Sequence, residues 1–212
     1  MRQEGHKPAQ NFARLFQTNS PLILASGSPR RKQFLLDLGI DFTVQTTDTP
    51  EQIGKNESPD YFVKRVSQDK AQAVAQNNKS SWVLGADTVV VFNNLILGKP
   101  ADRTEALEIL NMLNGKSHEV WTGFAICNES KSVRIQRAVK TEVLFFQSPK
   151  ELLLGYISTG EPFDKAGGYG IQGKGGVLVK TISGSYSNVV GLPLAEVVHC
   201  LITLGVIQPL AW

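Results

Sequence analysis

The sequence predicts an α/β fold in which helices pack around a mixed β-sheet. Short apolar runs of strand length alternate with amphipathic segments of helix length, which is typical of α/β proteins. The polar turns Asn93-Asn94 and Asn128-Glu129-Ser130 each join two strand-like runs, which predicts antiparallel hairpins in the same sheet. The composition, 42% hydrophobic and 19% charged over 212 residues, suits one folded domain and excludes extensive disorder.

Local signals set the elements in the first half of the chain. Ser28-Pro29 and Ser58-Pro59 each have the form of a helix cap followed by proline at the first helical position, and Gly39 suits the end of the first helix. The predicted order is a buried strand at 22–25, a helix at 30–38, a strand at 42–46, a loop at 47–57, a helix from 59 to 77, and a hairpin of strands at 82–92 and 95–97.

The second half of the chain repeats this alternation and adds a glycine-rich stretch. The predicted order is a helix at 104–113, strands at 118–127 and 132–146, a helix from 149 to 159, a loop at 160–176, a strand at 177–182 and a helix from 193 to 204. A loop of that length inside a domain is usually functional or mobile. Residues 1–20 are predicted to be an N-terminal extension that docks weakly, and residues 21–212 a single domain.

Charge, cysteine content and hydropathy exclude several classes of function. Cys127 and Cys200 are too few for a disulfide framework or a four-cysteine zinc site. The formal charge of +3 is too small to indicate binding of duplex nucleic acid. No apolar run approaches the roughly 20 residues of a membrane helix, and residues 1–20 contain no apolar signal core. We therefore expect a cytoplasmic protein with no nucleic-acid and no membrane partner.

The segment from Ser26 to Lys32, which includes Ser28, carries the first candidate site. Arg30, Arg31 and Lys32 crowd the first turn of a helix whose N-terminus already carries partial positive charge. A bound anion would offset that repulsion, and phosphate is the obvious candidate. The alternative is a solvated basic turn on a surface helix.

Lys70, Asp87 and Lys99 are candidates in apolar or constrained surroundings. Lys70 falls on the apolar stripe of its helix, where it either reaches out to water or points at an anion in a cleft. Asp87 interrupts an apolar strand, where a carboxylate is costly unless it is paired or bound to a metal. We predict a metal ligand or general base, the alternative being a buried carboxylate satisfied by a neighbouring lysine or backbone N–H. Lys99, between Gly98 and Pro100, is by itself typical of a simple turn.

Residues 161–173 combine glycines with charged and polar side chains in one short window. Glycine lets a backbone approach a ligand closely, and the Gln172 amide both donates and accepts hydrogen bonds, which suits the edge of a nucleobase. The alternative is a flexible surface loop. His118 and His199 are predicted to be structural, because nothing around them matches a catalytic triad or a zinc-binding helix.

Five stretches of the chain carry a family resemblance when they are taken together. They are LASGSPRR at 24–31, ADTVV at 86–90, LGKP at 97–100, DKAGGYGIQG at 164–173 and GSYSNVVGLPL at 184–194. With them the chain resembles, over about residues 21–207, the Maf family of nucleoside triphosphate pyrophosphatases, whose name refers to inhibition of septum formation. The DKAG and IQG motifs are similar to those of the branch of this family that acts on dTTP and UTP. The resemblance implies an elongated mixed sheet in two lobes around a nucleotide-binding cleft, like that of inosine triphosphatases.

The resemblance also implies a role for each matching position. Asp87 is the implied general base and, with Glu51, the implied ligand of a divalent cation, Mg²⁺ or Mn²⁺. The implied substrate-selecting residues are Arg30, Thr88 and Gln172. The implied phosphate-binding residues are Ser26, Ser28, Arg31, Lys70 and Lys99.

The reaction that this resemblance implies is metal-assisted hydrolysis of a nucleoside triphosphate between its α- and β-phosphates. The products are a nucleoside monophosphate and pyrophosphate, and the substrates dTTP and UTP or modified pyrimidine nucleotides. Family members are often dimers, so a homodimer is a further expectation. Two alternatives stay open: a nucleotide-binding regulator of cell division with little catalysis, and a nucleic-acid binder, which the small net charge disfavours.

Overall fold

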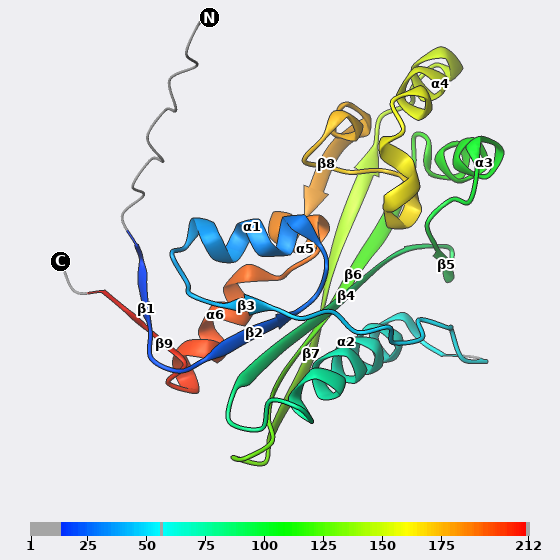
Figure 1. Ribbon diagram of the computed structural model, residues 1–212. Helices are drawn as coiled ribbons and strands as arrows, with labels where there is room; N and C mark the ends of the chain where they lie inside the picture. Colours follow the sequence, from blue (N-terminus) through cyan, green and yellow to red (C-terminus); the bar gives the residue numbers. More distant parts are fainter. Residues whose placement is uncertain (1–13, 56, 211–212) are drawn as a thin grey trace, which may run out of the picture.

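A mixed β-sheet forms the centre of the computed structural model, which describes residues 14–55 and 57–210 (Figure 1). Within these residues the sheet has seven strands in the order β3-β2-β4-β6-β7-β8, with β5 paired to β4. Strand β2 runs parallel to β3 and to β4, and the other pairs are antiparallel. The predicted mixed α/β fold is therefore confirmed.

The strands and helices have the following bounds. The strands are β1 (Phe16–Thr18), β2 (Leu22–Ala25), β3 (Thr43–Val44), β4 (Trp82–Phe92), β5 (Leu95–Leu97), β6 (Ser117–Asn128), β7 (Val133–Phe145), β8 (Val179–Ser183) and β9 (Ile207–Pro209). The α-helices are α1 (Pro29–Asp37), α2 (Pro59–Ala75), α3 (Arg103–Leu113), α4 (Lys150–Ser158), α5 (Tyr186–Val190) and α6 (Leu194–Thr203). Three short 3₁₀-helices are η1 (Glu161–Asp164), η2 (Ala166–Gly168) and η3 (Lys174–Leu178).

Strand β4 presents alternate residues to the two faces of the sheet. On one face, Leu84 and Ala86 belong to a core packed against α1 and α6, whereas Val90 belongs to a second core packed against α3 and α4. Thr88 falls between these two cores. On the other face, α2 covers the strand, and Asp87 points towards it. The two polar residues thus lie where the α1–α6 lobe meets the α3–α4 lobe. Figure 1 shows β4 running between these two groups of helices.

Two glycines let α2 lie very close to the sheet. A Cβ atom on Gly85 would overlap the carbonyl oxygen of Ser67 on α2, and one on Gly123 would overlap a backbone oxygen one turn earlier. Gly123 lies directly opposite Asp87 in the register of β4 and β6. This close approach brings Lys70, on the same face of α2, to Asp87.

The N-terminal segment differs from the prediction of a weakly docked extension over residues 1–20. Residues 1–13 lie outside the described residues, but β1 pairs antiparallel with β9 near the C-terminus. Arg14 also forms an ion pair with Asp41 at 2.6 Å. Backbone pairing between the two ends of the chain, which no local pattern encodes, therefore ties residues 14–20 to the rest of the fold.

Other elements differ in length or were not predicted. The strand predicted at 42–46 is reduced to the two residues of β3, and the loop predicted at 160–176 contains η1, η2 and the start of η3. Helix α5 and strand β9 had no predicted counterpart, because five and three residues are too few to show a periodic pattern.

Candidate active site

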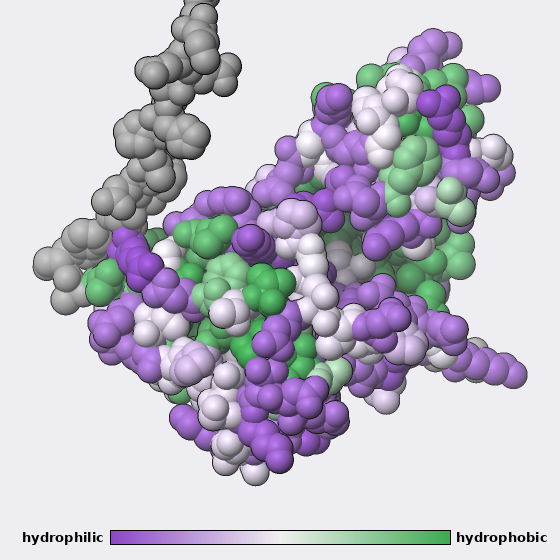
Figure 2. Space-filling model, in the orientation of Figure 1, coloured by the Kyte–Doolittle hydropathy of each residue, from purple (hydrophilic) through white to green (hydrophobic). Residues whose placement is uncertain are grey.

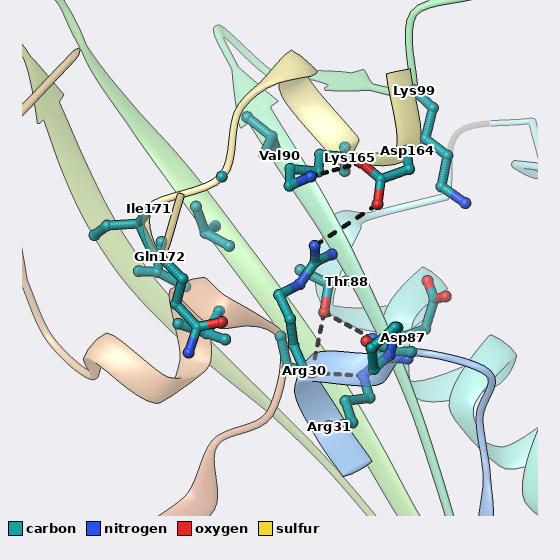
Figure 3. A pocket seen from close by; sticks show the side chains of 18 of the residues that line it. Arg30, Arg31, Asp87, Thr88, Val90, Lys99, Asp164, Lys165, Ile171 and Gln172 are labelled. Carbon is teal, nitrogen blue, oxygen red and sulfur yellow. Dashed lines mark hydrogen bonds and ion pairs between the residues drawn. The ribbon is translucent and has the colours of Figure 1, made fainter. Parts of the chain in front are cut away.

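A polar cavity of about 400 Å³ opens between the two lobes, within the range of roughly 300–1,000 Å³ typical of small-molecule sites. Figure 2 shows the molecule hollowed between these two parts, with hydrophilic side chains around the opening. All ten predicted site residues line this cavity: Ser26, Ser28, Arg30, Arg31, Glu51, Lys70, Asp87, Thr88, Lys99 and Gln172. They come from α1, α2, β4 and the loops between elements, including the loop between β2 and α1 (Figure 3).

Lys70 lies between two carboxylates on the wall formed by α2 and β4. Its ammonium nitrogen is 2.7 Å from Oδ1 of Asp87 and 2.6 Å from Oε1 of Glu51. The Asp87 side chain is only 8% exposed and that of Lys70 13%, whereas Glu51 is 52% exposed. Burial raises the pKa of Glu51, but the hydrogen bond and charge of Lys70, with the charges of Lys99 and Arg31, outweigh it and hold that pKa below its ordinary value. The Lys70 ammonium thus lies between two carboxylates, one buried and one half-exposed.

Arg31 is placed differently from the phosphate contact that the resemblance implies. Its guanidinium is buried and donates to the carbonyl oxygens of Gly191 (2.7 Å) and Ala86 (2.9 Å) and to the hydroxyls of Ser26 (2.9 Å) and Thr88 (3.0 Å). These four bonds leave at most one of its five N–H groups for a ligand. Arg31 thus ties α1 to β4 and to the turn before α6 and supports the cavity wall. Its contact with phosphate stays a prediction.

The Thr88 hydroxyl is committed in the same network. It accepts from Arg31, lies 2.9 Å from the hydroxyl of Thr122, and is 3.4 Å from the carbonyl oxygen of Gly191. A hydroxyl has one proton to donate, and protein acceptors take it here. This geometry places Thr88 beside Arg31 in the cavity wall, and its role in substrate selection stays a prediction.

The N-terminus of α1 faces the same cavity. Ser28 takes the cap position but forms no side-chain cap hydrogen bond, and proline follows at the first helical position. The hydroxyl oxygen of Ser26 accepts from Arg31 and from the backbone N–H of Ser28 (3.3 Å), which leaves its own proton to donate. The first-turn N–H groups of a helix have no intrahelical partner and carry partial positive charge. With the Arg30 side chain alongside, this end of α1 can hold an anion.

The opposite wall comes from η1, η2 and the turn that carries Gln172. In Figure 3, Gln172 and Lys99 lie well apart on either side of Arg30. The carboxylate of Asp164 is 3.9 Å from the Arg30 guanidinium and accepts from Lys165 at 2.5 Å, so it links α1 to η1 across the cavity. Asp164 stood in a motif quoted for the resemblance, but nothing in the sequence singled it out for this link.

The carboxylate pair fits a divalent cation in part. Mg²⁺ takes oxygen ligands and is usually held by one or two carboxylates together with substrate phosphates and water. Glu51 and Asp87 are such a pair, since one ammonium contacts an oxygen of each. Among the described residues, no cluster of three or more histidine, cysteine, aspartate or glutamate side chains could hold a metal. Phosphate oxygens of a substrate would have to complete the coordination.

Fold and cavity together define an α/β protein whose interlobe site combines a helix N-terminus, several cations and a carboxylate pair. The chain belongs to the Maf family, because the family model described as "Maf-like protein" matches residues 21–204. In the part of the chain that the structure describes, no helix has both the length and the apolar character to cross a membrane.

Relatives with curated names support the same family. A dTTP/UTP pyrophosphatase of Desulfotalea psychrophila is 46% identical over 194 residues, covering 92% of this chain and 100% of the relative. One of Geobacter metallireducens is 46% identical over 187 residues, covering 88% and 97%, and one of Bacillus cereus is 48% identical over 178 residues, covering 84% and 92%.

Solved structures show a more distant similarity. The Ham1 protein of Staphylococcus aureus has a TM-score of 0.42 at 11% identity and covers 60% of this chain and 73% of that chain. A nucleoside-triphosphatase, named a dITP/XTP pyrophosphatase, of Mycobacterium abscessus has a TM-score of 0.42 at 10% identity and covers 87% and 97%.

Proposed function

We propose that this protein is a dTTP/UTP pyrophosphatase that releases a nucleoside monophosphate and pyrophosphate. The observation that carries the proposal is the Glu51–Lys70–Asp87 arrangement in the wall of a cavity that the N-terminus of α1 also faces. Such a cavity brings acidic groups that can activate water next to cations that can hold a polyphosphate. Relatives named dTTP/UTP pyrophosphatase, at 46–48% identity over most of the chain, support the reaction and the substrates.

The phosphates would bind between the N-terminus of α1 and the lysines. Ser26 and Ser28 offer hydroxyl groups, and Arg30 and Lys99 offer charges at the cavity surface. Lys70 is within reach of the same space from the carboxylate side. Arg31 contributes indirectly, because its guanidinium donates a hydrogen bond to the hydroxyl of Ser26 and so holds Ser26 in place. These cations offset the negative charge that develops on the oxygens as the phosphoanhydride bond breaks.

Asp87 would orient the attacking water and accept its proton. Its Oδ1 accepts from Lys70, and the described residues contain no hydrogen bond to Oδ2, which suits contact with water. The water oxygen forms a bond to the α-phosphorus, the proton moves to the carboxylate, and the bond from that phosphorus to the bridging oxygen breaks with pyrophosphate as leaving group. A divalent cation held by Glu51 and Asp87 would supply Lewis-acid polarisation of phosphate oxygens.

Base selection would rest on Gln172, with Arg30 beside it. The Gln172 side chain is exposed to the cavity, and the described residues offer it no hydrogen-bond partner. Thymine and uracil present a carbonyl oxygen next to an N–H group, and one amide can pair with both. Cytosine presents the opposite pattern on that edge, so a site built to pair with uracil leaves polar groups unsatisfied when cytosine binds.

Pyrophosphate release by the purified protein tests this proposal. The substrates are dTTP, UTP, CTP, GTP and dATP, each with Mg²⁺ or Mn²⁺. Release from dTTP and UTP, at least about tenfold faster than from the others, is the expected result. Equal release from all five would remove the base selection, and nucleotide binding without release from any would favour a regulator with little catalysis.

Three parts of the proposal rest on the family resemblance. They are the identity of the cation as Mg²⁺ or Mn²⁺, the association into a homodimer, and the cytoplasmic location. Metal-free protein, after treatment with a chelator, should lose pyrophosphate release and regain it when Mg²⁺ or Mn²⁺ is added back.

A further inference from the structure

The segment 170–175 carries Gln172 in a tight turn whose shape is set from outside the turn. The Gly173 N–H donates to the carbonyl oxygen of Gly170 at 3.2 Å, and Gln172 stands at the tip. Gln172 itself makes no hydrogen bond with the described residues. Its position in the cavity therefore depends on how the two ends of the turn are held.

Two side chains, Glu161 and Tyr156, hold both ends of this turn. At its start, the N–H of Gly170 donates to the hydroxyl oxygen of Tyr156 at 3.2 Å. At its end, the N–H of Lys174 donates to Oε2 of Glu161 at 2.9 Å, and the N–H of Gly175 to Oε1 at 3.1 Å. The Tyr156 hydroxyl donates to the same Oε1 at 3.1 Å, so the two anchors are bonded to each other.

The protonation states suit these bonds. Burial raises the pKa of Tyr156, and the charge of Glu161 raises it further, so the hydroxyl keeps its proton. Burial also raises the pKa of Glu161, but the N–H groups of Gly175 and Lys174 and the Tyr156 hydroxyl outweigh it and leave that pKa below its ordinary value. An ionised carboxylate thus accepts three bonds, which are stronger than those to a neutral acceptor.

Packing ties the turn to the same carboxylate. A Cβ atom on Gly173 would lie 2.5 Å from both carboxylate oxygens of Glu161, so only glycine lets the backbone pass this close. Tyr156 is 4% exposed and belongs to the core against α4, which makes it a fixed point for the turn. The hydrogen bond from Gly170 to Tyr156 therefore joins the turn to a buried residue of the core.

We infer that Glu161 and Tyr156 are positioning residues for base recognition, which place Gln172 where it can pair with the pyrimidine. This inference rests on the proposed function, in which Gln172 distinguishes dTTP from CTP. Neither anchor is among the residues that line the cavity, so both act through the turn and not through substrate.

Tyr156→Phe is the sharpest variant, because it removes one oxygen and keeps the ring in the core. It deletes the bond to Gly170 and the bond to Glu161 together. Hydrogen exchange at the amides of 170–175 should become faster, and the ratio of kcat/KM for dTTP over CTP should fall by roughly tenfold, as for loss of a hydrogen bond of ordinary strength. Glu161→Gln should act in the same direction, and Tyr61→Phe, at an exposed tyrosine on α2, serves as the matched control.

A double-mutant cycle separates this inference from the proposed function. If Tyr156 acts through Gln172, then Tyr156→Phe and Gln172→Ala should each lower the dTTP/CTP ratio, and the double variant should lower it no further. A wild-type ratio in Tyr156→Phe, or unchanged exchange at 170–175, would overturn the inference while a lowered ratio in Gln172→Ala kept the proposed function. A wild-type ratio in Gln172→Ala would overturn the proposed base recognition and, with it, this inference.

Discussion

Gly85→Ala tests whether the close packing of α2 on the sheet sets the geometry of the active site. The added methyl group would overlap the carbonyl oxygen of Ser67 and lie 2.9 Å from the backbone nitrogen of Ala71, and these two residues flank Lys70. Ordinary contact requires 3.4–4 Å, so α2 has to retreat from the sheet by on the order of 1 Å. Overpacking of this kind costs about 1–3 kcal/mol of stability, and a 1 Å displacement of a catalytic group costs roughly 100-fold in rate.

Urea unfolding and pyrophosphate release at saturating dTTP measure the two effects in the same preparation. Gly155→Ala, within α4, is the matched control, because a Cβ atom there meets no other atom within 4 Å. This control should keep its activity and gain up to about 1 kcal/mol from helix propensity. If Gly85→Ala unfolds at the wild-type urea concentration and turns over dTTP at the wild-type rate, then close packing does not set the distance between Lys70 and Asp87.

Three further variants test single residues of the site and its surroundings. Lys99→Ala should lower kcat/KM by a similar factor for dTTP, UTP and CTP, because the proposed contact of its exposed ammonium is with phosphate and not with base; a loss confined to one base would contradict this. Arg31→Lys should lower the free energy of unfolding in urea by about 2–4 kcal/mol, since it breaks bonds to β4, to Gly191 and to Ser26, and an unchanged value would contradict the support role. Burial lowers the pKa of His118 from 6.5 to about 4. At pH 5 the imidazole is therefore protonated in the unfolded chain but not in the folded one. The free energy of unfolding of the wild type should fall by about 2 kcal/mol as the pH is lowered from 7.5 to 5. His118→Gln, whose amide can still form a hydrogen bond with the Tyr169 hydroxyl, should lose much less over this range, and parallel profiles would contradict this assignment.

The candidate site residues that lie inside a helix or a strand could be identified from the sequence. A carboxylate within the apolar β4 and a lysine on the apolar stripe of α2 each needed a partner, and the structure pairs Asp87 with Lys70. Local pattern alone suggested both residues, although only the tertiary contact shows that they are partners. Glu51, in an exposed loop, entered through the family resemblance, and its distance to Lys70 is fixed by how that loop folds.

Neighbouring arginines show where prediction from sequence ends. Arg30 and Arg31 follow each other in one motif, but consecutive helical residues point about 100° apart. Arg30 therefore faces the cavity and Asp164, whereas Arg31 points inward to backbone carbonyls on β4 and before α6. The two carbonyl acceptors of Arg31 lie 55 and 160 residues away in sequence, so no local signal could reveal that these donors are used within the fold.

The anchoring of the glycine-rich segment was hidden for the same reason. In the sequence, Glu161 is one residue of a predicted loop and Tyr156 one residue of a predicted helix. Only the fold brings both side chains to the turn that carries Gln172. The pairing of β1 with β9 likewise joins residues near the two ends of the described chain. Contacts of such long sequence separation depend on the whole fold and leave no periodic pattern.

The identity of the products from dTTP is the measurement that decides whether this cavity is a pyrophosphatase site centred on Asp87. We would incubate the purified wild type and the Asp87→Asn variant with dTTP and Mg²⁺ and separate the products by chromatography. Thermal unfolding of both proteins checks that the variant, which differs by one group, is folded. We predict TMP and pyrophosphate in equal amounts from the wild type, and formation at least about 100-fold slower from the variant. TDP and inorganic phosphate as products, or equal rates from the two proteins, would contradict the proposed chemistry and the role of Asp87.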